Sequence, residues 1–141
     1  MAKKCFFCDV QTQPDGNRIA ENQYFFARYD DAPVTDGHCE IISKRHLESF
    51  FELATEQVQS LYDLVINVKE IVDQKFKPDG YNIGINEGAA AGRTLPHLHV
   101  HLIPRYNSDV DNPRGGIRNV IPQKADYVPE MERMPAKKDY L

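Results

Sequence analysis

The chain has 141 residues and a formal net charge of −4, which fits one domain of ordinary size and disfavours a uniformly basic nucleic-acid-binding protein. Its longest stretch without Asp, Glu, Lys or Arg is the 11 residues from Thr94 to Pro104. A membrane span needs roughly 20 apolar residues, so we expect no membrane partner. The negative net charge leads us to expect no nucleic-acid partner either. Three cysteines are an odd number and too few for a disulfide scaffold, so we expect a reducing, cytoplasmic location.

Hydrophobic runs in the first half of the chain predict strands followed by helices. The aromatic run Tyr24–Tyr29 and the run Cys39–Ser43 are typical of short strands. Residues 44–53 could form a short helix, and a longer helix is expected from Thr55, as a capping residue, to about Phe76. Apolar residues recur there at spacings of three and four and form one hydrophobic face: Val58, Leu61, Val65, Val68, Val72 and Phe76.

The second half of the chain predicts two further strands and a tail. Tyr81–Asn86 and Pro96–Ile103 alternate in character, as half-buried strands do. The pattern stops at Pro104, and we expect residues 104–141 to form an extended C-terminal tail of one domain, residues 1–141. Strands, then helices, then strands indicate an α+β fold with an antiparallel sheet of about five strands, one long helix and one short helix.

Three histidines alternate with aliphatic residues in the last of these strands. Because residues two apart point to the same face of a strand, His97, His99 and His101 share one face, and the aliphatic residues between them face the long helix. A row of imidazoles is costly to bury without partners, so this row indicates a functional site. Two chemistries fit it: a metal site, or one imidazole that acts as a nucleophile.

The loop before the histidine strand favours the nucleophile. Asn86–Thr94 combines small residues with a guanidinium and a hydroxyl, and such a loop lets backbone N–H groups approach phosphate oxygens. The histidine strand contains no acidic residue that could complete a metal site. The combination therefore indicates a phosphate ester or anhydride as substrate.

With this motif the chain resembles the histidine triad (HIT) family of nucleotide hydrolases and transferases, whose signature is His-φ-His-φ-His-φ-φ with φ apolar. His97–Ile103 matches the signature in full, and Asp30–His38, the residues up to His46 and Asn86–Thr94 resemble further family segments. The resemblance covers nearly the whole chain and implies a HIT-like fold, a nucleotide substrate with adenine as the expected base, and no organic cofactor. Members with this triad are usually homodimers, which would cover an exposed edge strand.

The resemblance also implies roles for individual residues. His99, the middle histidine, is expected to attack the α-phosphorus and form a covalent nucleotidyl intermediate, with its other ring nitrogen bonded to a backbone carbonyl. His101 is expected to contact the phosphate as the second catalytic residue. The other implied residues are Asp30 at the ribose, Asn86 at the phosphate side or in the framework, Gly92, Arg93 and Thr94 around the phosphate oxygens, and His38, which either supports the site from behind or is a packed structural histidine.

Arg93 departs from the family pattern, in which Gln is common at this position. A guanidinium can donate two parallel, charge-assisted hydrogen bonds where an amide donates one neutral bond. We expect Arg93 to favour polyphosphate leaving groups over the neutral amine of a phosphoramidate. The alternative is an exposed Arg93 paired with Glu87.

Cys5 and Cys8 have the spacing of metal ligands, although one such pair also fits two small buried thiols. Some HIT proteins resemble this chain in an N-terminal Cys-x-x-Cys that binds zinc together with two histidines, which correspond to His46 and His97 here. The resemblance thus implies one structural zinc ion per chain and leaves His97 without a chemical step. Cys39, in a short apolar strand, is expected to fill the core.

The leading hypothesis is an enzyme that cleaves the α-phosphate bond of dinucleoside polyphosphates or related adenylates. Three alternatives stay open: a non-catalytic nucleotide-binding or signalling module, an adenosine phosphoramidase, and a metalloenzyme that uses all three triad histidines as ligands. The intact triad favours the enzyme.

Overall fold

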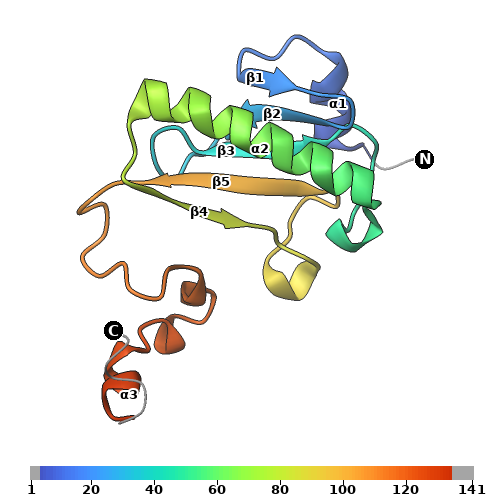
Figure 1. The fold of residues 1–141 in the computed structure, drawn as a ribbon. Coiled ribbons are helices and arrows are strands. Elements are labelled where there is room, and N and C mark those ends of the chain that lie inside the picture. Colours follow the sequence, from blue (N-terminus) through green and yellow to red (C-terminus); the bar gives the residue numbers. More distant parts are fainter. Residues whose placement is uncertain (1–3, 135–141) are drawn as a thin grey trace. The chain divides into compact units, whose positions relative to one another are not determined.

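The computed structural model describes residues 4–134 of a chain that divides into two compact units, residues 1–106 and 107–141. The first unit contains a five-stranded antiparallel sheet with the strand order β1-β2-β3-β5-β4, shown in Figure 1. The strands are β1 (Arg18–Glu21), β2 (Phe25–Tyr29), β3 (Cys39–Ser43), β4 (Gly80–Gly84) and β5 (His99–Arg105). The predicted α+β fold is therefore confirmed.

The long helix α2 (Thr55–Phe76) crosses one face of the sheet (Figure 1). It has the predicted bounds, but Ala54 rather than Thr55 is its N-cap, and the Gln57 side chain accepts the Ala54 N–H. Helix and sheet bury one hydrophobic core, to which Leu98, Val100 and Leu102 belong, as the alternation predicted. The buried helix residues of this core are Leu61, Leu64, Val68 and Val72.

A short helix that the sequence analysis missed, α1 (Phe6–Thr12), covers the opposite face. Its Phe7 packs with Phe26 and Ile42, which alternate with the α2-facing residues of their strands. Arg18 holds the helix end by donating to two carbonyl oxygens of its last turn. A helix this short is not stable by itself, so it depends on these contacts. Its sequence has no periodic apolar pattern that would predict it.

Two local predictions differ from the structure. Residues 44–53 do not form a helix; only Phe50–Glu52 makes a single 3-10 turn, η1, which Ser49 caps. The histidine strand is also shifted, because β5 begins at His99 and runs through Pro104 to Arg105. Proline is tolerated there because the pairing with β3 ends at Leu102, and the Pro104 carbonyl accepts from the Thr35 hydroxyl instead.

The structure describes the second unit over residues 107–134. It contains two 3-10 segments and a short helix: η3 (Gly116–Val120), η4 (Pro122–Lys124) and α3 (Val128–Glu132). Arg118 donates to the carbonyls of Lys124 and Ala125, and Arg114 pairs with Asp126 at 3.0 Å. Residues 135–141 of the predicted tail lie outside the described residues. Across residues 4–134, no helix is long and apolar enough to cross a membrane.

Candidate active site and metal centre

His99 is buried at the start of β5, on the face that carries α1. Its Nδ1 lies 2.7 Å from the backbone carbonyl oxygen of His97. A carbonyl can only accept, so Nδ1 carries the proton and Nε2 keeps its lone pair. The predicted bond between the middle histidine and a backbone carbonyl is therefore present, and it leaves a nucleophilic nitrogen on the other side of the ring.

Two aromatic rings flank the His99 imidazole. The Phe7 ring from α1 lies 5.0 Å from it, centroid to centroid, and the His101 ring lies 5.1 Å from it. Phe7 is only 1% exposed, so its ring has little freedom to leave. The nucleophile candidate is thus held by packing as well as by its hydrogen bond.

His101 receives its orientation from His38. The Val34 N–H donates to His38 Nδ1, so the proton of a neutral His38 is on Nε2, which lies 2.9 Å from His101 Nδ1. His101 then accepts at Nδ1 and presents its own proton at Nε2. Burial lowers the pKa of His38, and burial together with the neighbouring His99 and His38 lowers the pKa of His101 to about 4. His101 is therefore an uncharged N–H donor at neutral pH.

The loop between β2 and β3 brings Asp30 to the same place. Asp30 Oδ2 lies 3.5 Å from His38 Nε2 and 4.0 Å from His101 Nδ1. Gly37 permits this loop because its φ is +83° and a Cβ there would lie 2.8 Å from the Phe76 ring. These three ligand atoms also lie close enough to hold a metal, but the proton that the Val34 amide keeps on His38 Nε2 opposes that use.

The small-residue loop contains the 3-10 turn η2 (Ala89–Ala91), with Gly88 and Gly92 at positive φ on either side. Gly92 and Thr94 are exposed, and Asn86 is half-buried. Their roles at the phosphate stay predictions.

Arg93 does not pair with Glu87, as the alternative reading of this residue supposed. Its guanidinium donates to the Glu48 carbonyl at 2.7 Å and lies 3.4 Å from the Glu48 carboxylate. Glu87 instead accepts the Phe50 N–H at 3.0 Å. Both contacts tie the loop to the segment that follows β3, so Arg93 has a structural partner whatever it does toward a nucleotide.

The four predicted zinc ligands converge. The ligand atoms of Cys5, Cys8, His46 and His97 all lie within 4.8 Å of one another. Sulfur–nitrogen distances in this set are 3.2, 3.5 and 3.6 Å. Tetrahedral zinc with its usual bond lengths places sulfur and nitrogen ligands about 3.6 Å apart, so the set fits zinc.

The protonation of His97 also fits a metal ligand. Its Nε2 donates to the Ser43 carbonyl at 2.7 Å, which leaves the Nδ1 lone pair directed at the two thiols. Burial lowers its pKa and keeps the ring neutral. Cys39 fills the core as predicted, and burial raises the pKa of its thiol to about 12.

The three triad histidines do not form one metal site. His97 faces the thiols, His99 Nδ1 faces a carbonyl, and His101 faces His38. Within residues 4–134 no group of metal-ligating side chains contains all three. The metalloenzyme alternative is therefore wrong for this arrangement.

A buried ionic cluster beside the triad was not predicted from the sequence. Arg28, only 3% exposed, pairs with Asp15 at 2.8 Å, Asp31 at 3.0 Å and Glu40 at 3.5 Å. Glu40 is opposite His101 in the β3–β5 register. Burial and the nearby Asp30 raise the pKa of Glu40 to about 7, although Arg28 opposes the shift. Charged residues inside two hydrophobic strands were the only signal of this cluster.

The chain shares its fold with solved structures of HIT proteins. A HIT family protein from Bacillus anthracis is 33% identical, with 77% of each chain covered and a TM-score of 0.70. A Zn-bound histidine triad family protein from Mycobacterium smegmatis is 32% identical, with a TM-score of 0.67 over 74% of this chain and 77% of that one.

Relatives with named activities are also similar. An adenosine 5'-monophosphoramidase of Schizosaccharomyces pombe is 31% identical over 106 residues, 74% of this chain and 77% of the relative. The asymmetrical bis(5'-nucleosyl)-tetraphosphatase of the same yeast is 35% identical over 77 residues, but these cover 55% of this chain and only 42% of the relative. An uncharacterized HIT-like protein of Mycoplasma genitalium is 35% identical over 74% of each chain. Residues 11–108 match the HIT domain model, and the chain belongs to the HIT family.

Proposed function

We propose that this protein is a nucleotide hydrolase or nucleotidyl transferase that cleaves the α-phosphate bond of dinucleoside polyphosphates or related adenylates. The observation that carries the proposal is the hydrogen bond from His99 Nδ1 to the His97 carbonyl, which leaves the lone pair on Nε2, across the ring from that carbonyl. The neutral His101 beside it supplies a donor for a phosphate oxygen. One relative is named as a bis(5'-nucleosyl)-tetraphosphatase and another as an adenosine 5'-monophosphoramidase, and these names support cleavage at a nucleotide phosphate.

In the proposed reaction His99 Nε2 attacks the α-phosphorus. The Nε2–P bond forms, the bond from phosphorus to the leaving group breaks, and the leaving group departs with the electron pair and takes up a proton. Water or another acceptor then attacks phosphorus, loses its proton, and returns the electron pair to Nε2. The N–H of His101 stabilises the charge that develops on the phosphate oxygens.

The other predicted residues complete this proposal. Asp30 would accept from the ribose, and Asn86, Gly92 and Thr94 would bind phosphate oxygens. Arg93 would use guanidinium N–H groups beyond those bonded to Glu48. His38 would orient His101 rather than touch the nucleotide.

We also propose that the Cys5, Cys8, His46 and His97 set holds one structural zinc ion per chain. Four protein ligands leave no open position, so the ion supplies stability and not a reaction step. The cysteines form no disulfide, which fits a reducing compartment such as the cytoplasm, and we propose that location.

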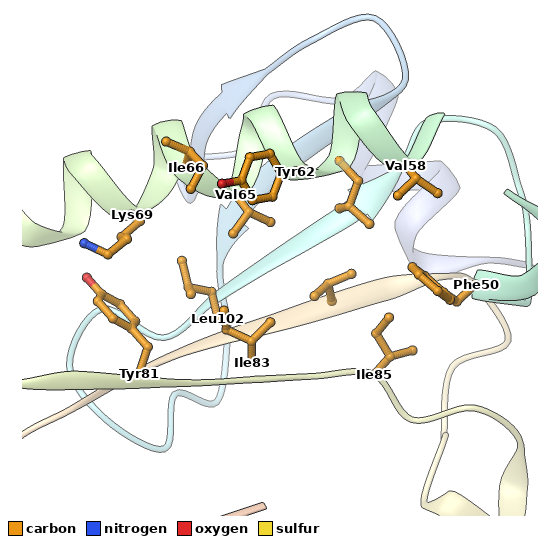
Figure 2. A pocket seen from close by; sticks show the side chains of 12 residues that line it. Phe50, Val58, Tyr62, Val65, Ile66, Lys69, Tyr81, Ile83, Ile85 and Leu102 are labelled. Carbon is orange, nitrogen blue, oxygen red and sulfur yellow. The ribbon is translucent and has the colours of Figure 1, made fainter. Parts of the chain in front are cut away.

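We propose that two copies of the chain form a homodimer through the β4 edge and α2. A groove of about 400 Å³ lies between these elements (Figure 2). Tyr62 and Ile66 point into it from the helix and Ile83 from the strand, and all three are more than a third exposed. A second copy would cover this apolar surface and the free edge of the sheet. Sedimentation of wild type and Ile66→Glu tests it, with Gln74→Glu as a control elsewhere on the helix; a monomeric wild type refutes it.

The activity is tested with a panel of diadenosine polyphosphates and adenosine phosphoramidate. Wild type should turn over at least one of them and yield a nucleotidyl adduct in mass analysis after rapid denaturation without acid, because acid cleaves the P–N bond. His99→Ala should lose the adduct and most of the turnover, and His101→Ala should retain more activity. Nucleotide binding without any turnover would support the non-catalytic module, and turnover of the phosphoramidate alone would support the phosphoramidase.

A further inference from the structure

The four proposed metal ligands, Cys5, Cys8, His46 and His97, are called the metal set here. This set is connected to the nucleophile His99 through one shared residue, His97. His97 uses its side chain toward Cys5 and Cys8 and its backbone carbonyl toward His99 Nδ1. A change at the metal ligands that shifts the His97 backbone would therefore move the hydrogen-bond acceptor of the nucleophile.

Phe7 makes a second connection between the two sites. It lies between the two cysteines in sequence, and its ring contacts both His97, at 5.6 Å, and His99, at 5.0 Å. The helix that carries it has seven residues and buries only Phe7. The buried residues it packs on are Phe26 and Ile42, a small cluster compared with the main core. Metal binding at Cys5 and Cys8 would add an anchor at the N-terminus of this short helix, opposite the Arg18 bonds to its last turn.

We propose that the metal set controls the nucleophile: metal bound by Cys5, Cys8, His46 and His97 fixes the position and tautomer of His99 through the His97 carbonyl and the Phe7 ring. Phe7 is then a positioning residue for the reaction, although it touches no substrate. The inference rests on the proposed function for its kinetic consequence, but the coupling itself concerns the free protein. It assigns the metal a task beyond stability, because its loss would leave the folded sheet with a mobile nucleophile.

Thermodynamic linkage requires that metal binding and nucleotide binding affect each other equally. If metal binding orders His99 for a nucleotide, then a nucleotide must tighten the binding of the metal by the same factor. An isolated structural metal, which only holds the N-terminus, would show no such factor.

The first test measures His99 in the absence of any reaction. Protein with ¹⁵N-labelled histidine is stripped of metal and titrated with zinc, with His99→Gln used to assign the signals. We expect the His99 ring nitrogens to show one Nδ1–H tautomer with zinc and a mixture without it. AMP should raise the zinc affinity, and zinc the AMP affinity, by equal factors. Absence of zinc uptake, unchanged His99 signals or a coupling factor of one would overturn the proposal.

The second test separates Phe7 from the metal. Phe7→Leu keeps an apolar side chain in the cluster but removes the flat ring from His99, and Phe6→Leu is the matched control because Phe6 is 41% exposed and faces Arg28. With zinc bound to both, we expect Phe7→Leu to lower kcat about tenfold with little change in KM, and Phe6→Leu to change neither more than about twofold. Equal kinetics of the two zinc-bound variants would remove Phe7 from the proposal. If wild type turns over no substrate, the proposed function fails while the His99 signals still decide the coupling.

Discussion

His38 Nε2 and His101 Nδ1 lie 2.9 Å apart, and the Val34 N–H on the far side of His38 fixes which of the two imidazoles donates. The bond makes His101 a neutral donor whose proton points away from His38. The pKa of His101, lowered to about 4, keeps it in that state over the physiological range. The sequence allowed either a supporting or a packing role for His38, and the structure shows that its hydrogen-bond partner is His101.

His38→Leu tests this relationship. The change leaves His101 Nδ1 without its donor, and a lost hydrogen bond next to a buried acceptor is worth about 1–2 kcal/mol, so kcat/KM should fall about 5- to 30-fold. His38→Gln can still donate from its amide and should lose less. Steady-state kinetics of both variants on the best substrate measure the effect, and equal losses would assign His38 a packing role.

Arg93→Gln tests the role predicted for this departure from the family pattern. If the guanidinium binds a polyphosphate leaving group, the change should lower kcat/KM for diadenosine polyphosphates by about 1.5–3 kcal/mol, or roughly 10- to 150-fold, and affect phosphoramidate cleavage much less. The contact to Glu48 gives a control. Glu48→Gln removes the carboxylate but keeps the carbonyl acceptor, and it should not reduce turnover of either substrate. Equal losses on both substrates in Arg93→Gln would show that the residue only anchors its loop.

The fold was predictable where a period is long enough to be read. Helix α2 shows six turns of apolar spacing, and the alternation around His99 assigns each face of β5. Helix α1 was not predictable, because its seven residues acquire their structure from the small Phe7 cluster and the carbonyl contacts of Arg18. Pro104 ended the predicted strand too early, because only the pairing reveals that β3 no longer lies beside it and that β4 pairs on its other side.

The identities of the site residues were predictable, but their connections were not. Nothing in the sequence says that the His97 carbonyl holds His99, or that Val34 sets the proton on His38. Such bonds come from the backbone, which any residue supplies, so residue types carry no sign of them. For the same reason the sequence suggested Glu87 as an alternative partner of Arg93, whereas its guanidinium donates to the Glu48 carbonyl.

Metal binding should stabilise the fold by an amount that grows with the logarithm of the zinc concentration. A ligand that binds only the folded state adds about 4 kcal/mol at a thousandfold excess over its dissociation constant. Thermal unfolding with and without zinc should show this gain in wild type, and Cys8→Ser should abolish it. Cys39→Ala is the matched control: it lowers stability by removing a buried core residue but should keep the full response to zinc. A zinc response that survives in Cys8→Ser would contradict the ligand assignment.

Glu40 should make stability depend on pH in a defined window. Its pKa is raised by burial to about 7, above the value of about 4.3 in an unfolded chain, so the folded state holds its proton more tightly. The resulting stabilisation is complete below about pH 4 and is lost as the pH rises through 7. Three histidines act in the opposite sense, because their lowered pKa values make the protein more stable as the pH rises: His38, His97 and His101.

The comparison with Glu40→Gln isolates the carboxyl from those histidines. The amide has the same shape, cannot ionise and can still accept from Arg28, while Asp15, Asp30, Asp31 and His101 around it are unchanged. Because Asp15 has a lowered pKa, its own effect falls below the window. The free energy of unfolding of the variant, relative to wild type, should therefore rise by about 1–3 kcal/mol between pH 5 and pH 8. Urea denaturation at four pH values in this range measures it, and a constant difference between the two proteins would show that Glu40 is ionised throughout and held by Arg28.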